Sequence, residues 1–118
     1  MTEKLIQQLQ DSCFDGLYQL ACNCYGATVT CALDILDLLR GSTVLGTEIT
    51  ADLQHLADEV LVLKSNRDGD RMREAAVQFR LIYLNLRVLQ QALEQTGKLP
   101  TDWRSCRVTR RTLRSALM

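Results

Sequence analysis

The chain has 118 residues, 47% of them hydrophobic, and its acidic and basic side chains balance to a net charge of zero. This length suits one domain that buries a core without metal or disulfide staples, and the composition excludes a disordered chain. Only six residues are aromatic, so the core must consist mainly of Leu, Ile, Val and Ala, as in packed helices. Uninterrupted apolar runs reach only four residues, at 60–63 and 81–84, so we expect no membrane span.

The cysteines and the first residues of the chain predict an intracellular protein. Residues 1–4 lead directly into an amphipathic pattern, without the apolar stretch of a signal peptide. The cysteine count is odd, and most of the thiols lie within helical patterns, where they behave as small hydrophobes. We therefore expect reduced thiols in the cytoplasm or the nucleus. The residues concerned are Cys13, Cys22, Cys24, Cys31 and Cys106.

The first helical pattern starts at Thr2 and continues in phase to Arg40. An apolar residue recurs at every third or fourth position, the spacing of one helical face. The phase holds across Gly26, but glycine weakens a helix interior by about 1 kcal/mol relative to alanine. One helix over residues 2–40 and two helices separated near residues 23–26 both fit the sequence. Gly41 is a natural stop, and residues 41–46 are expected to form a loop.

The next helix is expected to begin at Thr47 or Thr50, because either hydroxyl can cap a helix N-terminus. Residues 65–69 are expected to form a turn, with Asp68 or Asp70 capping the helix that follows. Between these points, apolar residues step by four, three, four and three, which is a seam for helix–helix packing. They are Ile49, Leu53, Leu56, Val60 and Leu63.

Residues 70–96 carry two apolar stripes on what must be one long helix. At about 100° per residue, the stripes are centred roughly 150° apart. Three arginines fill one gap between the stripes, and Glu74, Gln78 and Asn85 fill the other. The first stripe contains Met72, Ala75, Phe79, Ile82, Leu86, Leu89 and Leu93, with Ala76 and Tyr83 beside it. The second stripe contains Val77, Leu81, Leu84 and Val88, and the arginines are Arg73, Arg80 and Arg87.

A helix that is apolar on two sides is usually buried on both. In one arrangement the second stripe lies inside this chain, covered by the basic C-terminal residues. In the other it contacts a second polypeptide, and this is the arrangement we favour. The predicted partner-binding residues are then Val77, Leu81, Leu84 and Val88, with Arg73, Arg80 and Arg87 setting the register by charge.

The C-terminal residues differ from the body in charge. Residues 1–97 hold 8 basic and 13 acidic side chains, a net charge of −5, whereas residues 98–118 hold 6 basic side chains and one acidic, a net charge of +5. Gly97 and Pro100 end the long helix, and a final helix is expected from Trp103 to about Ala116. On that helix the arginines fall within about 120°, an arrangement suited to acidic proteins, nucleic acid, an anionic membrane surface or the chain's own carboxylates. The candidate residues are Trp103, Arg104, Arg107, Arg110, Arg111 and Arg114.

No motif for catalysis, metal binding or a cofactor accompanies these patterns. Cys22-Asn23-Cys24 lacks the further ligands that zinc needs, and His55 is the only histidine. Residues 66–70 resemble a calcium loop only faintly, since the required terminal glutamate would be Ala75. Asp34 and Asp37 are best explained as solvated acids on one helix. We therefore expect no enzyme, no metal and no cofactor.

Together these patterns predict an all-α fold. The expected architecture is an antiparallel four-helix bundle over residues 1–97 with a basic C-terminal helix or tail over residues 98–118. The predicted function is that of a non-catalytic adaptor subunit that binds another chain, in a homo- or hetero-oligomer, by helix–helix packing. The alternatives are a nucleic-acid-associated protein that contacts phosphates through its arginines, and a small secretion-type chaperone.

Overall fold

The computed structural model describes the backbone of residues 2–117 and the side chains of residues 2–114. All regular structure in this range is helical, which confirms the prediction of an all-α chain. None of these helices has the length and apolar character needed to cross a membrane. In chain order they are α1 (Thr2–Ala21), α2 (Tyr25–Arg40), α3 (Thr47–Val60), the 3-10 turn η1 (Leu61–Lys64), α4 (Gly69–Thr96), α5 (Trp103–Cys106) and α6 (Arg110–Leu117).

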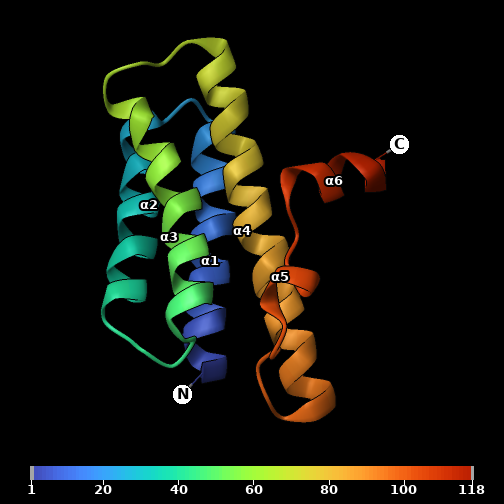
Figure 1. Ribbon diagram of the computed structural model, residues 1–118. Helices are drawn as coiled ribbons and strands as arrows, with labels where there is room; N and C mark the ends of the chain where they lie inside the picture. The colour runs from blue at the N-terminus through green and yellow to red at the C-terminus, as the bar shows by residue number, and fades with distance from the viewer. Residues whose placement is uncertain (1, 118) are drawn as a thin grey trace.

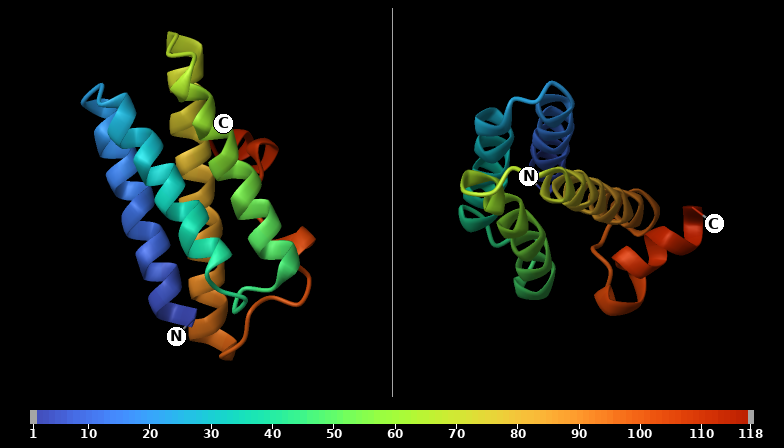
Figure 2. Two further views of the ribbon diagram at one scale, coloured as in Figure 1. Left: turned by 90° about the vertical axis from the view of Figure 1, so that its left-hand side faces the viewer. Right: turned by 90° about the horizontal axis from the view of Figure 1, so that it is seen from above.

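The four long helices stand side by side (Figure 1), and each runs roughly opposite to the one before it. Helix α1 packs against α2 and α4, and α3 packs against the same two helices, so the four enclose a common core. The view from above in Figure 2 shows α5 and α6 outside this group, beyond α4. Residues 98–117, here called the C-terminal segment, therefore lie outside the ring of four helices.

Residues 22–24 separate the first two helices, so the first pattern forms two helices. Asn23 has a φ of 60°, in the left-handed region, which asparagine tolerates better than most residues. The Cys24 N–H donates to the Gln19 carbonyl over 2.8 Å, and the Thr28 hydroxyl donates to the Cys24 carbonyl over 2.9 Å. The chain thus reverses direction within three residues.

The ends of α4 follow the sequence signals, and α3 begins at Thr47 as expected but without the predicted cap. Asp68 caps α4, because its carboxylate accepts a hydrogen bond of 2.8 Å from the Arg71 N–H. Gly97 ends α4 with a φ of 73°, and its N–H donates to the Leu93 carbonyl. Thr47 is the first residue of α3, preceded by Gly46 without a side-chain cap, so the predicted threonine cap is wrong.

The first apolar stripe of α4 forms the centre of the core. Phe79 is fully buried, as are Ile82, Leu86 and Leu89. The ring of Phe79 lies directly against Gly16 of α1, where a Cβ atom would come within 2.6 Å of two ring carbons. Glycine at this position therefore allows α1 and α4 to approach closely around an aromatic ring.

The predicted single helix from Trp103 to about Ala116 is wrong. The chain is helical over α5, extended at Arg107 with a ψ of 147°, and helical again over α6. The physical reason lies in α4, where the Asn85 side chain bonds both backbone groups of Val108 and so withdraws them from a helix. Because the helix is interrupted, the single 120° arc of arginines does not exist.

We predict that Gly16→Ala lowers the free energy of unfolding by roughly 1–3 kcal/mol, since the added methyl group overpacks the Phe79 ring. The matched control is Gly26→Ala in α2, where a Cβ atom would meet nothing within 4 Å. This variant is expected to retain its stability or to gain up to about 1 kcal/mol from helix propensity. Urea unfolding followed by circular dichroism measures both, and equal stability of the two variants would contradict the packing argument.

Candidate interaction surfaces on helix α4

The outer side of α4 carries three half-buried aliphatic residues beside a row of arginines. Val77, Leu84 and Val88 fall within about 40° of one another on the helix. The arginines recur at seven-residue intervals and are exposed, and Arg73 contacts Asp70 within the same helix. They are Arg73, Arg80 and Arg87.

Two exposed aromatic side chains of α1 extend this surface on the other side of the arginine row. Phe14 is 52% exposed and Tyr18 is 66% exposed. The Phe14 ring contacts Tyr83 of α4 with 4.7 Å between ring centroids. The sequence did carry a signal for this pair, since Phe14 and Tyr18 are four residues apart and lie off the apolar seam of α1. We call the aliphatic residues, the arginine row and these aromatic rings the outer surface.

Leu81 is separated from the other members of the second stripe. It is only 2% exposed, and it lies beneath the C-terminal segment instead of on the outer surface. A partner cannot contact Leu81 while that segment is in place. The second stripe is thus divided between the chain's own C-terminal residues and solvent.

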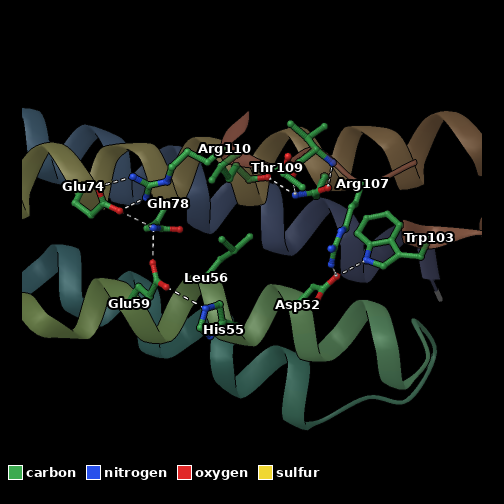
Figure 3. Close-up of a pocket in the computed structure, with 13 residues that line it drawn as sticks. Asp52, His55, Leu56, Glu59, Glu74, Gln78, Trp103, Arg107, Thr109 and Arg110 are labelled. Atoms are coloured by element: carbon green, nitrogen blue, oxygen red, sulfur yellow. Dashed lines mark hydrogen bonds and ion pairs between the residues drawn. The ribbon is translucent and has the colours of Figure 1, made fainter. Parts of the chain in front are cut away.

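A groove of about 480 Å³ lies between α3, α4 and the C-terminal segment. Figure 3 shows its polar side chains converging from the three elements. Asp52, His55, Leu56 and Glu59 come from α3, Glu74, Gln78, Leu81 and Asn85 from α4, and Trp103, Arg107, Val108, Thr109 and Arg110 from the C-terminal segment. We call this cavity and its walls the α3–α4 groove.

Three arginines of the C-terminal segment pair with carboxylates of the helical body. Arg107 Nη1 lies 3.0 Å from Asp52 Oδ2, which also accepts a 2.7 Å hydrogen bond from the Trp103 indole N–H. Arg110 donates to both carboxylate oxygens of Glu74, with 2.9 Å between Nη1 and Oε2. A third pair joins Arg104 Nε to Glu48 Oε1 over 3.3 Å at the surface. Of the partners that the sequence allowed for these arginines, the described contacts are thus with the chain's own carboxylates.

Asn85 holds the extended backbone between the two short helices. Its Oδ1 accepts a 2.7 Å hydrogen bond from the Val108 N–H, and its Nδ2 donates to the Val108 carbonyl over 2.9 Å. The side chain is 3% exposed, so these bonds are made away from water. A buried asparagine that bonds the N–H and the carbonyl of one residue fixes the position of the segment through main-chain atoms alone.

Gln78 is the other buried polar residue of the groove, and one of its atoms has no partner. Its Nε2 donates to Glu59 and, over 3.1 Å, to Glu74. The side chain is 2% exposed, and Oε1 has no hydrogen-bond partner among the described residues. The reverse amide orientation would place Oε1 against two carboxylates, so Nε2 faces them and Oε1 turns toward the cavity (Figure 3).

The remaining residues of the predicted basic surface lie in different environments. Trp103 is 3% exposed and belongs to the core cluster. Arg107 and Arg110 are half-buried in the groove, whereas Arg104, Arg111 and Arg114 are exposed. The predicted set is therefore divided between the groove and the surface.

The described residues contain no group of three or more His, Cys, Asp or Glu side chains placed to hold a metal ion. His55 instead lies 3.0 Å from Glu59 on the surface of α3. Burial raises the pKa of the Cys13 thiol to about 12, with a further contribution from Cys31. Burial also raises the pKa of Cys31 to about 12, reinforced by its hydrogen bond to Asp15.

Comparison with models of protein families, with curated proteins and with solved structures finds no match to this chain.

We predict that Asp52→Ala releases Trp103 from its buried position, because the indole N–H and Arg107 lose their common acceptor. A charge-assisted hydrogen bond contributes about 1.5–3 kcal/mol, enough to shift the docking of a short segment. Trp103 is the only tryptophan, so its emission is expected to move to longer wavelength while the helical circular dichroism is retained. Asp58→Ala, an exposed position on the same helix, is the control, and unchanged emission in Asp52→Ala would contradict the assignment.

We predict that iodoacetamide at pH 8 modifies the exposed thiols of Cys22, Cys24 and Cys106 in the folded protein. Cys13 and Cys31 remain protonated and buried, so they react only after unfolding. The raised pKa values of Cys13 and Cys31 also predict that the free energy of unfolding falls as the pH rises above about 8.5. The reason is that both thiols can ionise in the unfolded chain but stay protonated in the folded one. Mass spectrometry of labelled peptides checks the first result, and urea titrations between pH 7 and pH 10 check the second.

Proposed function

We propose that this chain is a non-catalytic helical subunit that binds an acidic amphipathic helix of another protein along the outer surface. In this proposal the body is an antiparallel four-helix bundle to which the basic C-terminal segment is appended. The protein acts inside the cell, where its five free thiols remain reduced. The observation that carries the proposal is the arginine row with apolar side chains on both sides of it.

The spacing of the arginines supports a helical partner. Seven residues correspond to two helical turns, so Arg73, Arg80 and Arg87 form a straight line along α4. A helix lying beside this line would place acidic side chains at the same interval. Its apolar residues would contact Phe14 and Tyr83 on one side and the half-buried aliphatic residues on the other. Exposed aromatic and arginine side chains are also enriched at protein interfaces.

The charge of the same surface opposes binding to a second copy of the chain. Pairing two outer surfaces would bring the arginine rows together, and like charges in contact are destabilising. We therefore favour a hetero-oligomer. Binding of nucleic acid by the C-terminal segment has less support, because Arg104, Arg107 and Arg110 already pair with carboxylates. A secretion-type chaperone would be a special case of the proposal, with a secreted protein as the partner.

A synthetic peptide of three heptads, with leucine on one face and glutamate at every seventh position, tests the proposal. We expect the chain alone to have the mass of a 13.4 kDa monomer in light scattering and to bind this peptide in titration calorimetry. Binding should weaken at high salt, because exposed charge pairs are screened. A peptide with lysine in place of glutamate should not bind.

The matched variants separate the outer surface from other faces. The double variant Arg80→Glu/Arg87→Glu is expected to lose the glutamate peptide and to bind the lysine peptide. Lys4→Glu, an exposed charge reversal on α1, is expected to bind as the wild type does. Equal affinity of the two peptides for the wild-type chain would overturn the proposal.

A further inference from the structure

The C-terminal segment is held on the body in the manner of a bound peptide. It reaches the groove through residues 97–102, which are exposed or half-exposed, and both of its helices are short. We infer that the α3–α4 groove is a binding site for a basic peptide of another protein whose backbone is extended between two short helices, and that residues 103–110 are a resident occupant of that site. This inference concerns a different face from the outer surface and does not depend on it.

The Asn85 bonds are the first reason for this inference. An asparagine that pairs with both backbone groups of one residue can hold any extended residue except proline, since all others offer an N–H and a carbonyl. Val108 is the residue bound in this way. The groove therefore recognises backbone geometry at this point, independently of sequence.

The carboxylates on either side define the side chains that fit. Asp52 binds the arginine one residue before the clamped position, and Glu74 binds the arginine two residues after it. Asp52 also accepts from an indole N–H five residues before the clamp. A matching peptide thus has an aromatic residue, an arginine and a second arginine at these three offsets. Arg110 donates two parallel hydrogen bonds to Glu74, as the planar guanidinium group allows, and Arg107 donates one to Asp52.

The resident segment leaves one polar atom of the groove without a hydrogen bond, and this is the second reason for the inference. Gln78 Oε1 is buried and has no partner among the described residues, although the cavity beside it has a volume of about 480 Å³. An acceptor in this position requires an N–H or O–H donor. Glu59 of α3 hydrogen-bonds to Gln78 across the groove, so a cationic donor would be favoured over a neutral one.

Thr109 borders this cavity one residue after the clamped position. In this chain the Thr109 hydroxyl contacts the first turn of α6, where it accepts a 3.3 Å hydrogen bond from the Thr112 N–H. We expect the longer side chain of a lysine or arginine at that offset to reach Gln78 and Glu59 across the cavity. A peptide with this extra cation would make contacts that the resident segment lacks. A free peptide needs these additional contacts in order to displace the resident segment. The resident segment is tethered to the body, which gives it an effective concentration of about millimolar at the groove.

Peptide binding to a full-length chain with a weakened resident segment tests the inference. The chain carries Trp103→Ala and Arg107→Ala, so it contains no tryptophan and reports only the tryptophan of the added peptide. The probes are residues 101–113 with Cys106→Ser, and the same peptide with Thr109→Lys. Both should bind saturably with a shift of emission to shorter wavelength, and the lysine peptide about tenfold more tightly, the value of one charge-assisted hydrogen bond.

Three changes to the experiment distinguish the groove from general attraction. Asn85→Ala in the same chain should weaken binding at least tenfold, the loss expected for two buried hydrogen bonds. A peptide with glutamate at the positions of Arg107 and Arg110 should not bind. Asp11→Ala, which removes an exposed carboxylate of α1 outside the groove, should change nothing. Binding that is equal with and without Asn85, or no saturable binding, would overturn the inference. A dimer formed by exchange of C-terminal segments, without binding of the free peptide, would assign the groove to a second copy and would also overturn it.

The wild-type chain offers a second measurement that needs no weakened variant. Thr109→Lys should slow hydrogen exchange at the Val108 N–H about tenfold, because the new donor holds the segment in the groove more firmly. Thr109→Glu should accelerate exchange at the same amide. Equal exchange in the two variants would overturn the assignment of Gln78 and Glu59 as a subsite for a cation.

Discussion

Helix α4 is apolar on two sides, and the arrangement of the other elements depends on this constraint. One side supplies Phe79 and its neighbours to the core that α1, α2 and α3 complete. The other side also has to be covered, because each fully buried aliphatic side chain is worth roughly 1.5–3 kcal/mol over its exposed state. The C-terminal segment covers Leu81 and leaves Val77, Leu84 and Val88 half-buried. The residues beyond Gly97 therefore contribute to the fold as well as carrying charge.

Local signals were sufficient to predict most of the helices but not the path of the C-terminal segment. The 3.6-residue periodicity predicted the extent of α4, and Asp68 and Gly97 marked its two ends. The interruption at Val108 has its cause 23 positions away in sequence, at Asn85, so no window around residues 103–116 contained the information. Asn85 and Gln78 appeared only as polar residues in the gap between two stripes. Both are buried where the C-terminal segment lies over α4, and their local sequence contains no signal for this contact.

The two surfaces of α4 differ in charge, and this difference separates the partners that each can bind. The outer surface presents arginines, whereas the α3–α4 groove is lined by Asp52, Glu59 and Glu74. An acidic helix would be repelled from the groove, and a basic peptide would be repelled from the arginine row. Under the two proposals above, one long helix would therefore serve two different contacts without competition between them. The carboxylates already paired with Arg107 and Arg110 also reduce the attraction of the groove for unrelated basic proteins.

The bonds made by Asn85 have a consequence for natural variation at the position that it binds. Both bonds end on main-chain atoms, so substitutions of Val108 by residues of other size or polarity leave them intact. Proline is the exception, since it has no N–H to donate. Among orthologues of this chain, residue 108 should accordingly drift in identity while position 85 stays fixed as asparagine.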